Sequence, residues 1–593
     1  MRVEEGFQIE PFVEDNPYTS DPVLPSLLKR ILPPQTLKEV EPDLVRFGQD
    51  VITKIRAAGD TVAPPKLTQY DQWGKRIDHL QTSEGWKFLK ATAQAEGIPG
   101  IFYERKYGED SRPYGFAKAL LMVGDSHEVF CPLSMTDGTA RVIQLMGTPG
   151  MKKHIFSRLI SRDPSRAFVS GQWMTERPGG SDVSRTETSA QYLSKSNRFG
   201  PFYYLDGFKW FSSATDSDIA VALARTGSPK DGSRSLSLFL VPLRLPFPRD
   251  PSDPVPSPTS NGILVHRLKN KIGTHALPTA ELSLERTEAN LIGPLNQGVK
   301  NITPVLNITR VWSAIASVGG LRKCMAIAIS YSKVRKVEGN KRLLKDAPIH
   351  VAQLASISLM YRALTHLTFG VIRLLGKVEC GTASEEEEYR LRMLTPVVKA
   401  FAAEKACACM EDAMTTLGGA GYMEENDIGR MIRDCLVEKI WEGTTTVLAL
   451  DLLRSVSDAK RFNSLLTWAN TIIESCSSEL QSTLQEQLQI LKSRKDLLKS
   501  IYQVPVTPLM PRPALILTGY VCASIYLLEH AIWSCNTGQP ETEIDVEVFK
   551  RWVDHSGFSA AVEDVKKANI NVDNVVWSNN AIVFGFSKVN PKL

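Results

Sequence analysis

Residues 172–184 read QWMTERPGGSDVS and residues 207–213 read GFKWFSS, and both lie in a stretch patterned as short strands and turns. Glycines let a ligand approach the backbone, hydroxyls supply hydrogen bonds, and a tryptophan supplies a broad apolar surface. Together these groups suit a large planar polar cofactor, whereas each string alone also fits an ordinary turn with a core tryptophan. The residues concerned are Thr175, Gly179, Gly180, Ser181, Trp210 and Ser212.

A third string, KIWEGTTT at 439–446, lies between two apolar stretches of helical spacing. Its carboxylate, Glu442, stands beside a glycine that permits a tight turn, and this arrangement suits a catalytic base. A lone glutamate is otherwise most often a solvated surface group. Glu442 is therefore a candidate base whose function depends on the two upstream strings.

The period of the apolar residues divides the chain into four predicted domains. Short alternating runs, such as residues 219–225 and 236–242, predict strands in the second domain, and helical spacing dominates elsewhere. The predicted domains are an N-terminal helical domain with an irregular leader at 1–165, a β-domain at 166–290, a helical bundle at 291–455 and an additional, mostly helical domain at 456–593.

Two segments stand outside this regular pattern. Residues 246–258 contain six prolines, which predicts a surface loop rather than a strand. The apolar run at 514–528 is too short to cross a bilayer, which takes about 20 residues, so we expect no membrane span. In the last domain, four leucines fall on one predicted helical face: Leu480, Leu484, Leu488 and Leu491.

Composition excludes several classes of protein. The formal net charge is +5, from 70 Lys and Arg against 65 Asp and Glu, so the chain has no strong field for nucleic acid or an anionic membrane. The nine cysteines include no Cys-X-X-Cys pair, which argues against a disulfide framework and a zinc site. We therefore expect no metal and a reducing compartment.

The strings, in this order, resemble the flavin-dependent acyl-CoA dehydrogenase family. Within it, YDQWGKRIDHL from Tyr70, GAGYMEEN from Gly419 and IWEGTTTVLALDLLR from Ile440 are similar to the AidB-like, alkylation-response branch. The resemblance covers roughly residues 60–455. The strings that carry the family signatures are Met174-Thr175-Glu176, Gly179-Gly180-Ser181-Asp182, Trp210-Phe211-Ser212, Gly418-Gly419-Ala420-Gly421, Arg433-Asp434 and Glu442-Gly443-Thr444.

This resemblance implies an α+β, mainly α fold. Its parts are an N-terminal helical domain, a middle β-barrel or sandwich, a C-terminal four-helix bundle and an extra C-terminal helical domain. It also implies FAD as cofactor and an acyl-CoA or related acyl thioester as substrate. Glu442 would remove the proton α to the thioester carbonyl while the β-hydrogen leaves as hydride to the flavin, giving a trans-2-enoyl thioester.

The resemblance also implies which residues bind. Some members carry the base on an earlier helix, but this chain has Thr309 there, which cannot act as a carboxylate base. Thr446 stands where Gln or Asn is usual. Ser181 and Arg310 are the implied substrate contacts. The implied cofactor contacts are Met174, Thr175, Gly180, Ser181, Trp210, Phe211, Ser212, Gly443, Thr444 and Thr446, together with Arg335, Gly418 and Gly419 toward the adenosine half of a neighbour's FAD.

Cofactor contacts from a neighbour imply a homo-oligomer, which in this family is expected to be a tetramer. The family's Arg-Lys-X-Phe-Gly string reads Arg335-Lys336-Val337-Glu338-Gly339 here. A carboxylate at Glu338 would disfavour a nearby pyrophosphate unless it points away.

Two other functions stay open. One is an AidB-like flavoprotein with weak dehydrogenase activity and a binding role for DNA or protein, which the near-neutral charge of 456–593 disfavours. The other is a peroxisomal, oxygen-using acyl-CoA oxidase. Sequence does not decide between an electron-transfer flavoprotein and O₂ as acceptor.

The two ends of the sequence bear on location. Pro591-Lys592-Leu593 resembles the small-basic-leucine signal for peroxisomes. Residues 1–12 resemble neither a secretory signal nor an Arg-rich presequence. A peroxisomal protein is therefore the expectation, and otherwise a cytoplasmic one.

Overall fold

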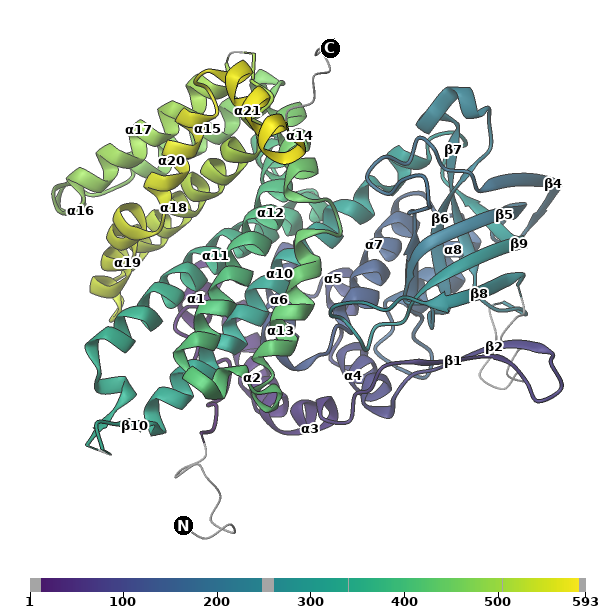
Figure 1. Cartoon of the computed structure of the whole chain (residues 1–593), viewed down its shortest axis with the longest axis horizontal. Helices are drawn as coiled ribbons and strands as arrows, with labels where there is room; N and C mark the ends of the chain where they lie inside the picture. Colours follow the sequence, from purple (N-terminus) through teal and green to yellow (C-terminus); the bar gives the residue numbers. More distant parts are fainter. Residues whose placement is uncertain (1–11, 248–260, 340, 504, 586–593) are drawn as a thin grey trace, which may run out of the picture.

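Helices make up most of the protein, and one β-domain stands at its side (Figure 1). The α+β, mainly helical fold expected from the sequence is confirmed. Most of the Pro-rich segment 246–258, and Pro591-Lys592-Leu593, lie outside the described residues. This computed structural model describes residues 12–247, 261–339, 341–503 and 505–585.

The N-terminal domain is helical but includes one unexpected β-hairpin. Strands β1 and β2 pair antiparallel and lean on the β-domain, where the Val265 N–H donates to Asp78 Oδ2 at 2.9 Å. The YDQWGKRIDHL string therefore forms the end of β1, the turn and most of β2, not a helix. The elements are α1 (Leu24–Ile31), α2 (Pro34–Asp50), α3 (Arg56–Gly59), β1 (Lys66–Tyr70), β2 (Arg76–Gln81), α4 (Glu84–Ala95), α5 (Gly100–Glu104), α6 (Ser111–Met122), α7 (Phe130–Met146), α8 (Pro149–Met151) and α9 (Ser157–Leu159).

The middle domain is a barrel. Strand β6 pairs with β7, β7 with β9, β9 with β5, β5 with β4, and β4 again with β6, which closes the ring. Closure leaves no open edge within this ring, while β3 pairs with β6 and β8 with β9. The strands are β3 (Ser170–Trp173), β4 (Ser189–Asn197), β5 (Gly200–Ser213), β6 (Ile219–Arg225), β7 (Leu236–Pro242), β8 (Ile263–Leu268) and β9 (Thr279–Ile292).

Strand β6 shows why the barrel stays against the helices. Successive side chains of a strand point to opposite faces. Ala220, Ala222 and Ala224 lie in the barrel core, whereas Ile219 and Val221 belong to the large core shared with the helices. All seven β6 residues are buried, so the predicted strands at 219–225 and 236–242 are confirmed as strands with two buried faces.

Three long helices form the centre of the protein. Helices α10 and α12 pack together over much of their length, and α11 packs on both. Residues 311–331 of α10 and 394–416 of α12 are mostly buried. The elements are α10 (Gly298–Val334), β10 (Lys336–Val337), β11 (Arg342–Leu343), α11 (Pro348–Cys380), α12 (Glu385–Thr416), α13 (Ile428–Cys435) and α14 (Thr445–Val456).

The additional domain is helical in its described residues and lies beside α11, α12 and α14 (Figure 1). The four predicted leucines are buried, but the helix is interrupted at Leu484, whose backbone is not helical at φ −109° and ψ 13°. The single helical face expected from the spacing is thus shared by two helices. The elements are α15 (Ala459–Glu474), α16 (Ser478–Thr483), α17 (Gln485–Tyr502), α18 (Pro511–Thr537), α19 (Thr542–His555), α20 (Phe558–Lys567) and α21 (Val572–Phe584).

Helix α18 corrects the expected length of the apolar run at 514–528. The helix has 27 residues, and by length and composition alone it could cross a membrane, with a mean hydropathy of 1.5 in its most apolar window. However, 89% of that window is buried inside the protein. The protein therefore uses α18 as a core helix of the additional domain.

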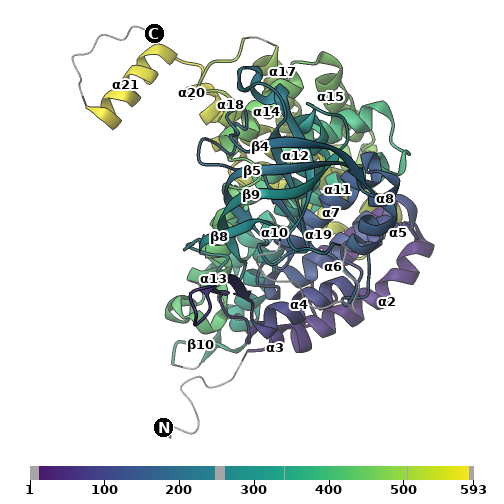
Figure 2. The ribbon, with the colours of Figure 1, turned by 90° about the vertical axis from the view of Figure 1, so that its right-hand side faces the viewer.

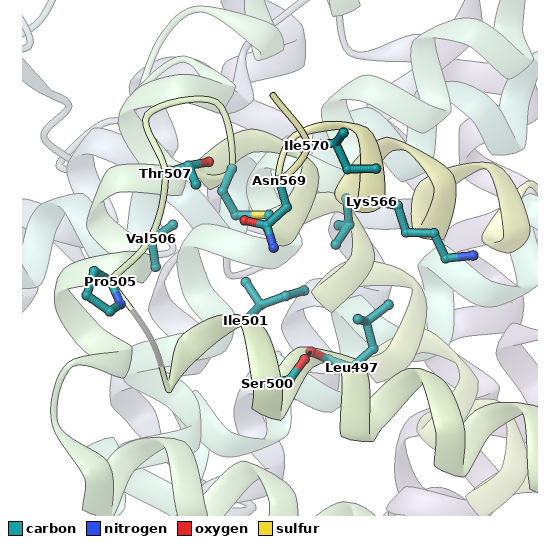
Figure 3. A pocket seen from close by; sticks show the side chains of 11 residues that line it. Leu497, Ser500, Ile501, Pro505, Val506, Thr507, Lys566, Asn569 and Ile570 are labelled. Carbon is teal, nitrogen blue, oxygen red and sulfur yellow. Dashed lines mark hydrogen bonds between the residues drawn. The ribbon is translucent and has the colours of Figure 1, made fainter. Parts of the chain in front are cut away.

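A cavity of about 250 Å³ lies in the additional domain, between α17 and α20 (Figure 3). Leu497, Ile501 and Val565 line it, and it shares no residue with the three sequence strings that predict the active site. Helix α21 extends away from the body of the protein, and none of its residues is buried (Figure 2).

Candidate active site

The two upstream strings meet in the β-domain. The Trp210 N–H on β5 donates to the Thr175 carbonyl at 3.0 Å, which sets the turn after β3 beside β5. The turn needs glycine at 179, because a Cβ there would lie 2.4 Å from the Asp182 carbonyl oxygen. Strings separated in sequence therefore form one surface.

A buried ion pair joins this turn to β5. Lys209 Nζ lies 2.6 Å from Glu176 Oε1, and the two side chains are 0% and 3% exposed. Glu176 also accepts hydrogen bonds from the Thr188 hydroxyl at 2.5 Å and the Glu187 N–H at 2.6 Å. Burial opposes ionisation of Glu176, but Lys209 and these donors outweigh it and lower its pKa. Lys209 also donates to the Leu223 carbonyl at 2.8 Å, so each end of the pair has further partners.

Ser212, two residues after Trp210, leaves polar capacity for a ligand. Lys269 Nζ lies 3.2 Å from the centroid of the Trp210 ring and 4.7 Å from that of the exposed Phe211. The Ser212 hydroxyl is buried and has no hydrogen-bond partner among the described residues. Its neighbour Ser213, in contrast, lies 3.1 Å from the Thr279 hydroxyl. A buried hydroxyl without a partner is costly, so Ser212 suits a bound polar group.

Glu442 lies in a turn between a short 3₁₀ segment, η10 (Leu436–Lys439), and α14. Its φ is +56°, a left-handed conformation that costs a non-glycine residue roughly 1–3 kcal/mol. Three hydrogen bonds hold it there. The Thr309 hydroxyl donates to Glu442 Oε2 at 2.6 Å, Arg310 Nε donates to its carbonyl at 3.3 Å, and Lys399 Nζ donates to the Gly443 carbonyl at 2.6 Å.

Burial makes Glu442 a stronger base than an exposed glutamate. It raises the pKa of the carboxyl, while the Thr309 hydroxyl and the charges of Arg310 and Lys399 oppose the rise. Arg310 is itself held by Asp451 at 2.9 Å. The side chain assigned to substrate from the resemblance therefore supports the turn that carries the candidate base.

The bundle and the β-domain meet at the Arg433-Asp434 string. The Thr274 N–H donates to Asp434 Oδ1 at 2.5 Å. A Cβ on Gly273 would lie 2.2 Å from the Arg433 carbonyl oxygen, so this close approach of two backbones requires glycine. The string thus fixes the loop between β8 and β9 relative to the helix that precedes Glu442.

Further ionisable groups surround this seam. Lys271 donates to the Leu277 carbonyl at 2.7 Å, and burial lowers its pKa to about 8. Burial raises the pKa of Glu128 well above its usual range, and the charges of Asp434 and Glu438 add to the rise. Burial also raises the pKa of the Cys131 thiol, which lies within the electrostatic influence of several of these groups.

The remaining predicted residues fall into two groups. Met174 is half-buried against the helical core, Gly180 and Ser181 lie exposed on the turn, Thr444 caps α14, and Thr446 is exposed on its first turn. Arg335, Gly418 and Gly419 are exposed and make none of the hydrogen bonds found around Glu442 in the described ranges. The exposed Glu338 pairs with Arg342, which partly neutralises its charge.

Sequence reasoning missed three buried charged residues: Lys209, Lys399 and Glu438. Each is 0% or 1% exposed. Charged side chains are rarely buried without a partner, so a lysine inside an apolar run, such as Lys399 between Val398 and Ala400, was the available signal. Apart from Trp441, which lies three residues after Glu438, the partners lie too far along the chain to be read from spacing.

Three stretches of the chain match known families. Residues 7–164 match the adaptive response protein AidB N-terminal domain, 171–287 the acyl-CoA dehydrogenase middle domain, and 296–457 the acyl-CoA dehydrogenase C-terminal domain. The chain belongs to the acyl-CoA dehydrogenase family, as an AidB-like member, and is an oxidoreductase of that family. Members of this family are flavoproteins in general.

Two curated relatives and one solved structure define the similarity. Acyl-CoA dehydrogenase family member 11 of Caenorhabditis elegans is 38% identical over 496 residues, covering 82% of this chain and 76% of that protein. Putative acyl-CoA dehydrogenase AidB of Escherichia coli is 29% identical over 420 residues, covering 69% and 72%. The crystal structure of C. elegans ACDH-11 in complex with C11-CoA has a TM-score of 0.86 at 32% identity, covering 99% of this chain and 100% of that one.

Proposed function

We propose that this protein catalyses FAD-dependent α,β-dehydrogenation of an acyl-CoA, with Glu442 as the base. The observation that carries the proposal is the Glu442 turn. Its backbone is left-handed, one hydrogen bond holds the carboxylate, two more hold the carbonyls of Glu442 and Gly443, and burial makes the carboxylate more basic. Strained residues that their surroundings hold in place are typical of functional sites. The ACDH-11 structure with C11-CoA supports an acyl-CoA as the class of substrate.

The residues present suit a flavin. The unpartnered Ser212 hydroxyl would donate to a polar edge of the ring system, and Trp210 would cover an apolar part. The turn at 174–181, with its two glycines, would let the backbone approach the same group. Bound FAD would supply the acceptor for the β-hydrogen.

Glu442 would accept the α-proton at one of its carboxylate oxygens. The Thr309 hydroxyl would keep the carboxylate oriented, since it donates to Oε2 and leaves Oε1 for the proton. A base whose pKa lies nearer the working pH takes up a proton more readily, so the burial of Glu442 favours this step. Because its pKa is raised, proton abstraction should fail as the pH falls through that value.

The test is anaerobic bleaching of the flavin by a panel of acyl-CoA esters, with wild type and Glu442→Gln. Glutamine keeps the shape but cannot accept the proton, so we expect bleaching to slow by about 10²–10⁴-fold. Flavin content should stay at the wild-type level. Equal bleaching of the two proteins would show that Glu442 is not the base.

We also propose a homotetramer in which the exposed Arg335, Gly418 and Gly419 of one subunit contact the adenosine half of a neighbour's FAD. Light scattering gives the assembly, and Arg335→Ala should lower flavin retention in it.

Peroxide formed in step with product under air would identify O₂ as acceptor. The peroxisomal location is proposed from Pro591-Lys592-Leu593, and deletion of these residues should abolish import.

A further inference from the structure

A buried carboxylate, Glu438, stands four residues before the candidate base. Glu438 is 1% exposed. Its Oε2 accepts hydrogen bonds from the Ser313 hydroxyl at 2.5 Å and from Trp441 Nε1 at 2.5 Å. Its Oε1 is buried without a partner among the described residues. One carboxylate oxygen thus accepts two hydrogen bonds and the other accepts none among the described residues. This is an unusual arrangement for a purely structural acid.

Glu438 is connected to the base through the chain. Trp441, which donates to Glu438, directly precedes Glu442, so the two carboxylates share one short turn. On the other side, Lys399 from α12 is 0% exposed and donates to the carbonyl of Gly443, the residue after the base. Movement of Glu438 would therefore change the orientation of the Glu442 carboxylate, and ionisation of Glu438 would change its pKa.

Several ionisable groups face Glu438 from the surrounding elements. Lys399 on α12 attracts its charge and Glu442 on the turn repels it. Glu128 just before α7, Cys131 in the first turn of α7 and Cys435 at the end of α13 also lie within its electrostatic influence. The positive charge of Lys399 acts on both carboxylates.

We propose that Glu438 is a positioning residue that sets the orientation and the basicity of Glu442. This inference rests on the proposed function. When Glu438 is ionised, the like charge favours protonation of Glu442 and strengthens it as a base. When Glu438 is protonated, Glu442 carries the charge alone. Interacting carboxylates titrate as a pair, so proton abstraction should show two ionisations rather than one.

Burial places the ionisation of Glu438 in the neutral range. Burial raises the pKa of its carboxyl to about 7, against the Ser313 and Trp441 hydrogen bonds and the Lys399 charge. Burial lowers the pKa of Lys399 to about 8. The pair can therefore change charge near physiological pH, where an exposed glutamate or lysine would not.

The test is the pH dependence of anaerobic flavin reduction in a single turnover, in Glu438→Gln and wild type. Glutamine can still accept from Ser313 and Trp441, but it carries no charge at any pH. At pH 5.5 we expect the two rates within about twofold, and at pH 7.5 the variant about three- to tenfold slower, with a single ionisation in its profile. A profile that superimposes on wild type, or a constant loss at every pH, would overturn the proposal.

If Glu438→Gln does not fold, a second variant tests the same proposal. Ser313→Ala removes one donor to the ionised carboxylate, so the upper ionisation should move to higher pH by about one unit at most. An unmoved upper ionisation would contradict the proposal. Glu411→Gln, an exposed glutamate on α12, is the matched control and should keep the wild-type profile.

Glu442→Gln separates the two hypotheses. If that variant is bleached as fast as wild type, the proposed function is wrong and this inference fails with it. If Glu442→Gln is not bleached while Glu438→Gln keeps both ionisations, only the inference about Glu438 fails.

Discussion

Two buried charged sites in this protein are built in opposite ways. In the β-domain, the Glu176 carboxylate is matched by Lys209 and by hydrogen bonds, and its pKa is lowered. In the bundle, Glu438 and Glu442 share one turn, and burial raises the pKa of both. The Glu176–Lys209 site stays ionised and holds the turn after β3, whereas Glu438 and Glu442 are more easily protonated. A group that must exchange a proton is suited by the second environment.

The largest expected effect is on the paired site. Lys209→Met leaves Glu176 buried without its cation, so the free energy of unfolding should fall by about 3–5 kcal/mol. Denaturant unfolding measures it. The double variant Lys209→Met with Glu176→Gln should recover part of the loss, since no charge is then left unpaired. A single variant as stable as wild type would show that the pair is not what fixes the turn.

The carboxylates of Glu438 and Glu176 should change the free energy of unfolding with opposite signs as the pH rises. The raised pKa of Glu438 means that its contribution to stability is present below the unfolded value near 4.5 and is lost as pH rises through about 7. Glu438→Gln should therefore gain up to about 3 kcal/mol relative to wild type between pH 4.5 and 7.5. Urea midpoints across this range measure the difference.

Glu176→Gln should show the reverse. The lowered pKa of Glu176 contributes stability above its unfolded value, which is lost as pH falls through the folded value. This variant should be less stable than wild type at pH 7.5 and approach it in acid. The same sign for both variants would remove the contrast between the two sites.

A smaller effect is expected from the hydrogen bond to the base. Thr309→Val keeps the shape but removes the donor to Glu442 Oε2, so the pKa of Glu442 should rise further. The acid limb of flavin reduction should move to higher pH by about one unit or less. The rate of flavin reduction on the plateau above this limb reports any loss of orientation of the Glu442 carboxylate. A limb that stays in place would show that Thr309 does not act on the ionised base.

The smallest effect separates two adjacent serines. Ser212→Ala removes the buried hydroxyl without a protein partner, and flavin affinity should fall by about five- to tenfold, the equivalent of roughly 1 kcal/mol. Ser213→Ala, whose hydroxyl lies beside Thr279, should keep wild-type affinity. Flavin retention on dilution of the holoprotein gives both values. Equal retention by both variants would remove Ser212 from the proposed cofactor site.

Much of the architecture could be predicted from pattern alone. The strands at 219–225 and 236–242 were visible because a strand between two cores is apolar on both faces. The hairpin at Tyr70 was missed, since its exposed faces carry no alternating apolar pattern. The interruption at Leu484 was missed because leucine spacing continues across it. The four domain boundaries and the peroxisomal location stay predictions.

The candidate site divides in the same way. Sequence by itself determined the strings around Thr175, Trp210 and Glu442, since their glycines, hydroxyls and carboxylate are properties of residue types. Only the tertiary structure decided that Thr309 and Lys399 hold the Glu442 turn, and that Glu438 is buried beside it. The physical reason is that the ionisation of a carboxylate depends on its burial and on polar and charged groups brought from 44 to 133 residues away, which no local spacing encodes.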